Sequence, residues 1–251
     1  MKSSIPIHSR NQPRLLFTAL VTVAFAASIA KAGIEPEARE IAKAMAAKIG
    51  AAQTIRLTAR HQLDPALGVG AKIEKGPIQI TVKRPNRFFA VMRAGHETRE
   101  IAFDGTTFCV MHPQLKHHAM EPLKAASIEL FADRVDEKFG FRPPVAELLA
   151  SDVAKQLFRD VTTARVAGSE MIGFVRCQRL HFEQPGMRSD VWVGLHDNLP
   201  RRYLLTFTDV PGDPEWDIRL SNWELNVPVD EALFSKRPAP DSQKVKMLIS
   251  R

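Results

Sequence analysis

The sequence is dominated by short segments in which apolar and polar residues alternate, and one of these segments contains its own turn. Between Arg99 and Pro113, apolar residues alternate with polar or small neighbours on both sides of Asp104-Gly105. An Asp-Gly pair tolerates the positive φ angles of a tight hairpin turn. Alternation with a period of two is typical of a strand that buries one face. We therefore predict a β-hairpin here, near the middle of one antiparallel sheet.

The same alternation recurs before and after this hairpin. The further segments are residues 55–60, 78–83, 88–92, 117–121, 162–166, 174–183, 189–195, 201–209 and 216–225. Glycine, proline, asparagine or aspartate lies in most of the gaps between them, as turns require. The chain therefore has enough strands to form one large sheet.

Helical spacing interrupts the strand pattern at two places. Residues 36–49 begin with a proline and carry apolar residues every four positions, which predicts an amphipathic helix. Residues 127–139 have a serine that can cap the start and are followed by Gly140, Pro143 and Pro144, which end the segment. Short helical pieces follow at 145–149 and 152–158. Such helices must cover one face of the sheet to bury their apolar stripes, so we predict an α+β fold.

The N-terminus has the pattern of a secretory signal peptide. Lys2, Arg10 and Arg14 precede the uncharged apolar stretch 15–29, which is followed by Ala30-Lys31-Ala32. The apolar stretch is shorter than the roughly 20 residues of a membrane-spanning helix. We predict cleavage after Ala32 and a periplasmic protein, the alternative being an uncleaved anchor. The expected domains are a signal peptide at 1–32, a folded domain at 33–236 and a flexible tail at 237–251.

Charge and cysteine content exclude some functions. Removal of the four basic residues of residues 1–32 lowers the count from 35 basic and 28 acidic residues to 31 and 28, a net charge of +3. The short basic pairs Lys83-Arg84 and Arg201-Arg202 flank strands, so we predict no nucleic-acid partner. Cys109 and Cys177 lie in separate strands and form no metal-type pair, and we predict no disulfide between them.

Six stretches together are similar to a known family. They are Val82–Arg87, Phe103–Thr107, Ala146–Leu149, Cys177–Phe182, Leu199–Arg202 and Leu220–Trp223. The chain resembles the predicted periplasmic family called domain of unknown function 2092 from about Pro36 to Phe234. That family is grouped with the periplasmic lipoprotein carriers of the LolA and LolB type. The resemblance implies a LolA-like open antiparallel β half-barrel, with an N-terminal helix and inserted lid helices on its concave face. It implies no activity or catalytic residues.

The sequence contains no recognisable catalytic or metal-binding motif. His112, His117 and His118 are close together, but a Pro-Gln turn separates them, so we interpret them as surface turn residues and predict no metal or cofactor. His181 alternates with apolar neighbours and is expected to point away from them as a partly exposed strand residue. Asp133, Asp136 and Glu137 suit the solvated side of the 127–139 helix.

The apolar face of the sheet is the remaining candidate site. Its expected members are Leu57, Ile78, Ile80, Val82, Phe89, Val91, Ile101, Phe103, Phe108, Val110, Leu180, Phe182, Trp192, Leu204, Phe207, Ile218 and Leu220. Within this face the predicted ligand-binding residues, together with Phe131 and Val135 of the lid helix, are Ile80, Phe89, Val91, Ile101, Phe103, Phe108, Val110, Leu180, Phe182, Trp192, Phe207 and Ile218. The face is either a pocket for an acyl chain or a filled core.

Three functions follow from this interpretation. The first is a periplasmic carrier or chaperone, not an enzyme, whose partner is a lipid or the acyl chain of a lipoprotein. The second is a sensory or regulatory module that binds an envelope protein through the same fold. The third is a hydrolase whose site is assembled only in space.

Overall fold

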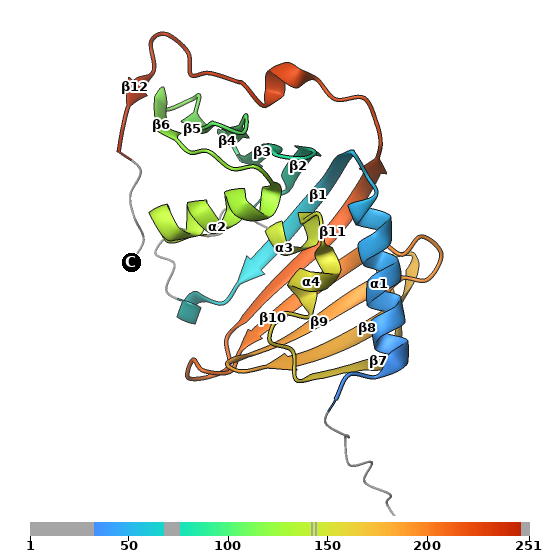
Figure 1. The fold of residues 1–251 in the computed structure, drawn as a ribbon. Helices are drawn as coiled ribbons and strands as arrows, with labels where there is room; N and C mark the ends of the chain where they lie inside the picture. Colours follow the sequence, from blue (N-terminus) through green and yellow to red (C-terminus); the bar gives the residue numbers. More distant parts are fainter. Residues whose placement is uncertain (1–32, 68–75, 142, 144, 247–251) are drawn as a thin grey trace, which may run out of the picture. The chain divides into compact units, whose positions relative to one another are not determined.

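The computed structural model describes residues 33–67, 76–141, 143 and 145–246. These residues form a single twelve-stranded sheet that curves around a group of helices (Figure 1). The strands are β1 (Thr54–Leu63), β2 (Ile78–Lys83), β3 (Arg87–Ala94), β4 (Glu97–Phe103), β5 (Thr107–His112), β6 (His117–Pro122), β7 (Thr163–Ile172), β8 (Val175–Gln184), β9 (Met187–Gly194), β10 (Pro200–Phe207), β11 (Glu215–Leu225) and β12 (Gln243–Lys244). The helices are α1 (Pro36–Gly50), α2 (Ile128–Phe139), α3 (Ala146–Leu149) and α4 (Val153–Leu157), with 3₁₀ turns η1 (Pro65–Leu67) and η2 (Glu231–Leu233).

The strand order is β12-β6-β5-β4-β3-β2-β1-β11-β10-β9-β8-β7. Each neighbouring pair is antiparallel except β12 and β6, which run parallel. The edge strands β12 and β7 do not pair with each other, so the sheet is open. The predicted α+β fold with an open antiparallel half-barrel is confirmed.

The hairpin of β4 and β5 has the turn that its sequence predicts. Gly105 has a φ of +92°, and Asp104 Oδ1 accepts hydrogen bonds from the backbone N–H groups of Thr106 and Thr107 at 2.9 and 2.8 Å. Its expected position near the middle of the sheet is wrong, because β4 and β5 are the fourth and third strands from the β12 edge. The two middle strands are instead β2 and β1, and β1 pairs on its other side with β11, a contact between distant parts of the sequence.

Helices α1 to α4 cover the concave face of the sheet (Figure 1). The α2 helix begins after Ser127, whose side chain accepts a hydrogen bond from Leu130 N, and ends at Gly140 with a φ of +72°. Those boundaries agree with the predicted caps. The α1 helix packs against β7 and α4, burying Ala42, Met45 and other residues of one face. The helices therefore bury the apolar side of the sheet as expected.

A C-terminal strap, residues 229–246, runs over the opposite face of the sheet. Phe234 is 1% exposed and packs in a second small cluster with residues of β3, β4 and β5. Arg237 donates to Asp104 at 2.9 Å, and the strap ends by pairing β12 with β6. Residues 237–246, expected to be a loose tail, are thus held by specific contacts. The polar sequence of this segment did not predict these contacts, because the segment is held by backbone hydrogen bonds and by surface ion pairs such as Lys116–Asp241.

Two sequence predictions concern residues without a structural description. The signal peptide at 1–32 lies outside the described residues, as does Pro144 after α2. Pro143, the other proline predicted to end the helix, is among the described residues and is buried. Cleavage after residue 32 therefore stays a prediction.

Candidate functional site

The concave face of the sheet contains most of the predicted ligand-binding residues. Ile80, Ile101, Phe103, Phe108, Phe131, Val135, Leu180, Phe182 and Ile218 are buried in one continuous cluster, and Val110 and Phe207 pack against it while partly exposed. This cluster runs under all four helices and across both halves of the sheet. The structure therefore gathers these eleven side chains on one apolar surface.

Phe131 is the centre of the contact between α2 and the sheet. Its ring stacks on Phe103 with centroids 4.1 Å apart, and lies 5.5 Å from Phe88 and 5.6 Å from Phe108. Its side chain is 0% exposed. Aromatic rings at these distances fill the layer between helix and sheet. In this structure the apolar face under α2 is thus a packed core, and α2 is closed on it.

Four predicted members of the apolar face lie on the other side of the sheet. Phe89 and Val91 belong to the cluster under the C-terminal strap, while Phe88, Ala90 and Met92 face the helices. The error arose because β3 is apolar on both sides, so alternation alone could not choose the face. The second face of β3 is apolar because the C-terminal strap buries it, and the sequence of the strap does not indicate that it covers this face.

Trp192 and Leu204 are the other two residues that were predicted on the concave face and lie on the convex face. Trp192 is 2% exposed but lies under the guanidinium groups of Arg202 and Arg179, which are 4.5 and 5.3 Å from its ring. Leu204 pairs opposite Asp190 and Asp217, whose carboxylates bind these two arginines on the convex side. A cation over an aromatic face is favourable, so this tryptophan is buried by charged neighbours rather than by the core.

One end of the concave face carries polar groups without partners. His61 is directly opposite Ile218 in the β1–β11 pairing, and Trp216 is opposite Leu63, which places all four side chains on the helix-covered face. The two rings have centroids 6.1 Å apart. Both ring nitrogens of His61 and Nε1 of Trp216 are buried and have no hydrogen-bond partner in the described part of the chain. Sequence analysis missed this pair because it forms only when β1 meets β11.

The chemistry of this pair follows from its burial. Burial lowers the pKa of His61, so the imidazole is neutral at ordinary pH and offers one donor and one acceptor. The indole of Trp216 adds a second donor. Leu205 pairs opposite Trp216, and Met187 and Phe207 lie at the neighbouring strand ends as partly buried residues. The pair therefore places two donors and one acceptor among apolar side chains.

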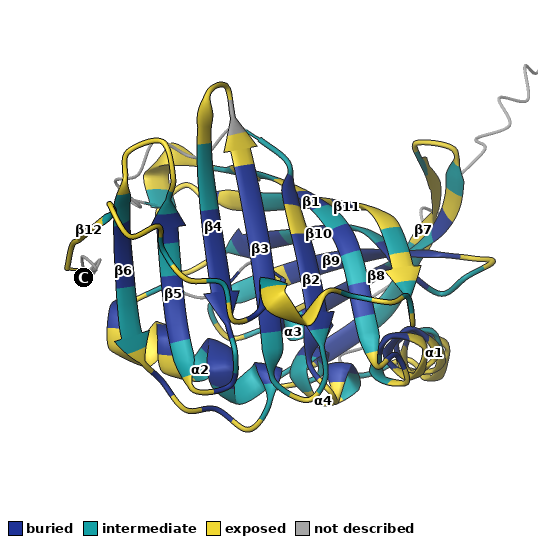
Figure 2. Ribbon diagram, turned by 90° about the horizontal axis from the view of Figure 1, so that it is seen from above, coloured by how far each residue is buried: buried dark blue, intermediate teal, exposed yellow. Residues whose placement is uncertain are grey.

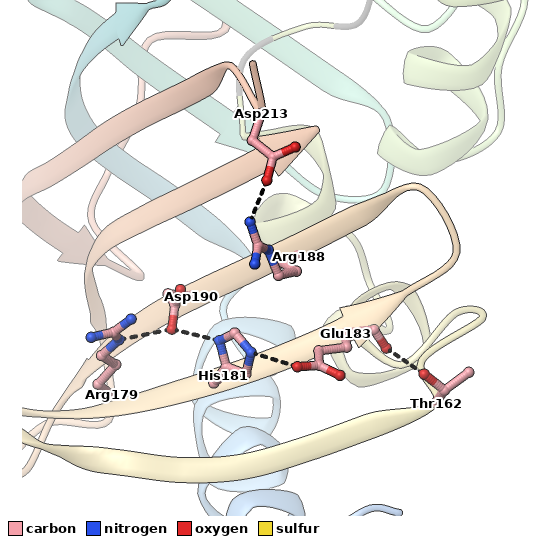
Figure 3. Close-up of polar contacts among 7 residues, drawn as sticks. All are labelled: Thr162, Arg179, His181, Glu183, Arg188, Asp190 and Asp213. Carbon is pink, nitrogen blue, oxygen red and sulfur yellow. Dashed lines mark hydrogen bonds and ion pairs between the residues drawn. The ribbon is translucent and has the colours of Figure 1, made fainter. Parts of the chain in front are cut away.

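A charged network occupies the convex face over β8 and β9 (Figure 3). Asp190 Oδ1 accepts from Arg179 Nε at 2.8 Å and lies 3.1 Å from His181 Nδ1, while His181 Nε2 is 3.2 Å from Glu183 Oε1. The hydrogen bond with Asp190 raises the pKa of His181, although burial opposes it. His181 points away from the apolar face as predicted, but it is buried rather than partly exposed, and the side chains of Asp190 and Glu183 contact its two ring nitrogens.

This network does not have the geometry of a hydrolytic site. A general base needs a ring nitrogen that can reach the hydroxyl of a nucleophile. In the structure both nitrogens of His181 contact carboxylates. The arrangement instead resembles a buried ion-pair network that joins adjacent strands. The polar side of α2 likewise agrees with a solvated face, since Asp136 and Glu137 are exposed.

The three clustered histidines lie on strands rather than in the turn between them. His112 ends β5 and accepts from Arg99 Nε at 2.9 Å, and His117 begins β6. His118 is 9% exposed and lies 3.0 Å from Ser242 of the strap, so its interpretation as a surface turn residue is wrong. Among the described residues no group of three or more His, Cys, Asp or Glu side chains could hold a metal ion.

Two grooves open on the surface away from these residues. One of about 190 Å³ lies beside α1, and one of about 400 Å³ lies at the turn between β7 and β8. Neither is lined by a predicted ligand-binding residue. Both cysteines are free and buried, on β5 and β8, with seven strands between them in the sheet.

Comparison with protein families identifies the chain. The model of the family described as "Predicted periplasmic protein (DUF2092)" matches residues 38–248. The chain belongs to this family. Membership in DUF2092 agrees with the resemblance in the sequence and establishes the periplasm as the location. No curated protein matches the chain. None of the helices in the described ranges is both long and apolar enough to cross a membrane.

Solved structures show where this DUF2092 protein stands among folds. Lipoprotein LppX from Mycobacterium tuberculosis is 12% identical with a TM-score of 0.50, and the match covers 78% of this chain and 98% of LppX. LprF from Mycobacterium bovis is 11% identical, with coverage of 82% and 98% and a TM-score of 0.48. A LolA superfamily protein from Nitrosomonas europaea is 10% identical, with coverage of 79% and 97% and a TM-score of 0.35. At this identity the likeness to LppX concerns the fold alone.

Proposed function

We propose that this protein binds an amphiphilic lipid in the periplasm, with the acyl chain on the concave face and a polar group at His61 and Trp216. The observation that carries the proposal is this pair of polar side chains at the end of an apolar surface, whose ring nitrogens have no hydrogen-bond partner among the described residues. Nearly all buried polar groups in proteins have a hydrogen-bond partner, so an exception suggests that a partner is supplied from outside. An ester, carboxyl or hydroxyl group would supply it.

The acyl chain requires space that the closed structure fills with side chains. The α2 helix presents Phe131, Val135 and Phe139 to the sheet, all fully or almost fully buried. An acyl chain can replace such contacts without leaving polar groups unpaired, because both surfaces are apolar. The helix is followed by Gly140 in the left-handed region, where the chain can change direction. We infer that α2 acts as a lid that moves away when the ligand enters.

The test is titration of the purified mature protein with a fluorescent fatty acid, together with mass spectrometry of organic extracts of protein purified natively from the periplasm. The variants Trp216→Phe and His61→Phe keep a ring of similar size and remove the polar groups. A lost hydrogen bond of about 0.5–1.5 kcal/mol predicts an affinity lower by about two- to tenfold in each. Extracted lipid is expected from the wild type.

The matched control is Trp223→Phe. The indole N–H of Trp223 already donates to the carbonyl oxygen of Pro200 at 2.9 Å, so its loss should not change the affinity for the fatty acid. Equal affinity in Trp216→Phe, His61→Phe and the wild type would show that these groups make no hydrogen bond with the fatty acid. Absence of both probe binding and extractable lipid would refute the lipid-binding proposal, and a stable envelope protein recovered by crosslinking would favour the partner-binding module.

A further inference from the structure

The hairpin of β7 and β8 carries a fully exposed phenylalanine at its tip. Ile172 and Val175 are the last pair of the ladder, and Gly173 and Phe174 form a two-residue turn. Gly173 has a φ of +58°, as the first position of a type II′ turn requires. The turn itself needs no apolar residue at its second position. Yet the Phe174 side chain is completely exposed, at 102%.

Other exposed apolar residues gather at the same corner of the sheet. Met171 is 53% exposed, and Leu195 in the next turn is 43% exposed. That turn is adjacent because Leu195 N donates to the carbonyl oxygen of Arg176 at 3.0 Å. Of the five exposed large apolar side chains in the described part of the chain, three are therefore at this corner. The hairpin extends beyond its neighbours near the β7 label in Figure 2 and is coloured mostly exposed.

A groove of about 400 Å³ lies directly behind the tip. Its walls include Ile172 and Val175 of the hairpin, Arg201 of β10, and Arg219 and Trp223 of β11. Arg201 is bound by Asp197, and the Arg219 side chain, which is 64% exposed, has its Nε 3.8 Å from Asp217 Oδ2. On the hairpin itself, Glu170 and Arg176 contribute one charge of each sign. The lining of the groove thus has two guanidinium groups and the carboxylate of Asp197, and Arg219 stays mostly exposed beside Asp217, which does not line the groove.

We propose that this corner binds the surface of an anionic phospholipid bilayer, independently of the acyl site on the concave face. Phe174 and Met171 enter the boundary between head groups and acyl chains, and Arg201, Arg219 and Trp223 lie at head-group depth. Tryptophan and arginine are suited to that depth because each has an apolar body and a polar end. The protein is periplasmic, so it meets membrane surfaces.

A bilayer fits this corner better than a folded protein partner. A standard protein interface buries roughly 800 Å² on each partner. One fully exposed aromatic ring of about 150–250 Å² and two half-exposed side chains present less than that. A narrow projecting turn with one aromatic residue and basic neighbours is instead sufficient for weak, reversible contact with a membrane.

The test is cosedimentation of the purified mature protein with vesicles of phosphatidylethanolamine and phosphatidylglycerol. Phe174→Ser should lower the partition coefficient about ten- to a hundredfold, since that is what burial of a phenylalanine contributes. Phe174→Trp should retain binding, with a blue shift of its fluorescence on the vesicles. Leu115→Ser is the matched control, because Leu115 is 52% exposed in the β5–β6 turn, outside this corner. It should bind as the wild type does.

Several outcomes would overturn the proposal. Binding of Phe174→Ser equal to the wild type, or an equal loss in Leu115→Ser, would show that the tip is not the contact. Equally strong binding to phosphatidylcholine vesicles would exclude the role of the arginines. A wild-type dimer that Phe174→Ser dissociates, without vesicle binding, would make the tip a contact between two copies. Fatty-acid affinity should be unchanged in Phe174→Ser, which separates this test from that of the acyl site.

Discussion

Replacement of Phe131 by alanine tests whether α2 is held to the sheet by its central ring. The ring is fully buried, and three other phenylalanine rings surround it at centroid distances of 4.1 to 5.6 Å. Loss of such a ring removes its transfer free energy and leaves a cavity, for a combined cost of about 3–5 kcal/mol. A domain of this size typically has about 5–15 kcal/mol of stability, so a large share would be lost. The melting temperature should fall by about 6–20 °C.

The measurement is urea unfolding followed by circular dichroism, in wild type, Phe131→Ala and Phe174→Ala. The last variant is the control, since Phe174 is fully exposed and its loss should change the free energy of unfolding by less than about 0.5 kcal/mol. A saturating fatty-acid probe should also raise the melting temperature of Phe131→Ala more than that of the wild type, because an apolar ligand can fill an apolar cavity. Equal stabilities of Phe131→Ala and Phe174→Ala would refute the packing argument.

Three further predictions concern the N-terminus, the thiols and the buried histidine. N-terminal sequencing of the periplasmic protein should begin at Gly33, and an intact N-terminus on membrane-bound protein would contradict the signal peptide. Thiol labelling of denatured, unreduced protein should modify both Cys109 and Cys177. Labelling of the native protein should be slow, because burial raises the pKa of each thiol. If the denatured protein is monomeric and does not react, the two cysteines form a disulfide. Asp190 raises the pKa of His181 in the folded protein. The contact between them therefore stabilises the fold fully below the ordinary histidine pKa of about 6.5, and this stabilisation is lost as the pH rises through the raised pKa of the folded state. The free energy of unfolding, measured at a series of pH values, should show this decline in the wild type and not in Asp190→Asn.

Secondary structure was largely predictable because its causes are local. The serine and glycine that cap α2 act within one turn of the helix, and the Asp-Gly turn between β4 and β5 needs only its own residues. Most strands followed from alternation, although β7 continues six residues beyond its predicted end at Val166. That extension is mostly exposed, so it has no buried face that could produce an alternating pattern.

The candidate sites depended on contacts between distant parts of the chain. Phe89 lies on the convex side because the strap, more than 130 residues later, supplies Phe234 to cover it. His61 and Trp216 meet only because β1 pairs with β11, and neither residue has a distinctive neighbour in the sequence. Periodicity reports that a side chain is buried on one face or the other, but it does not report what covers that face. The sequence by itself therefore determined the elements and their apolar sides, whereas strand pairing in the tertiary structure decided which polar groups of the described residues are buried without partners.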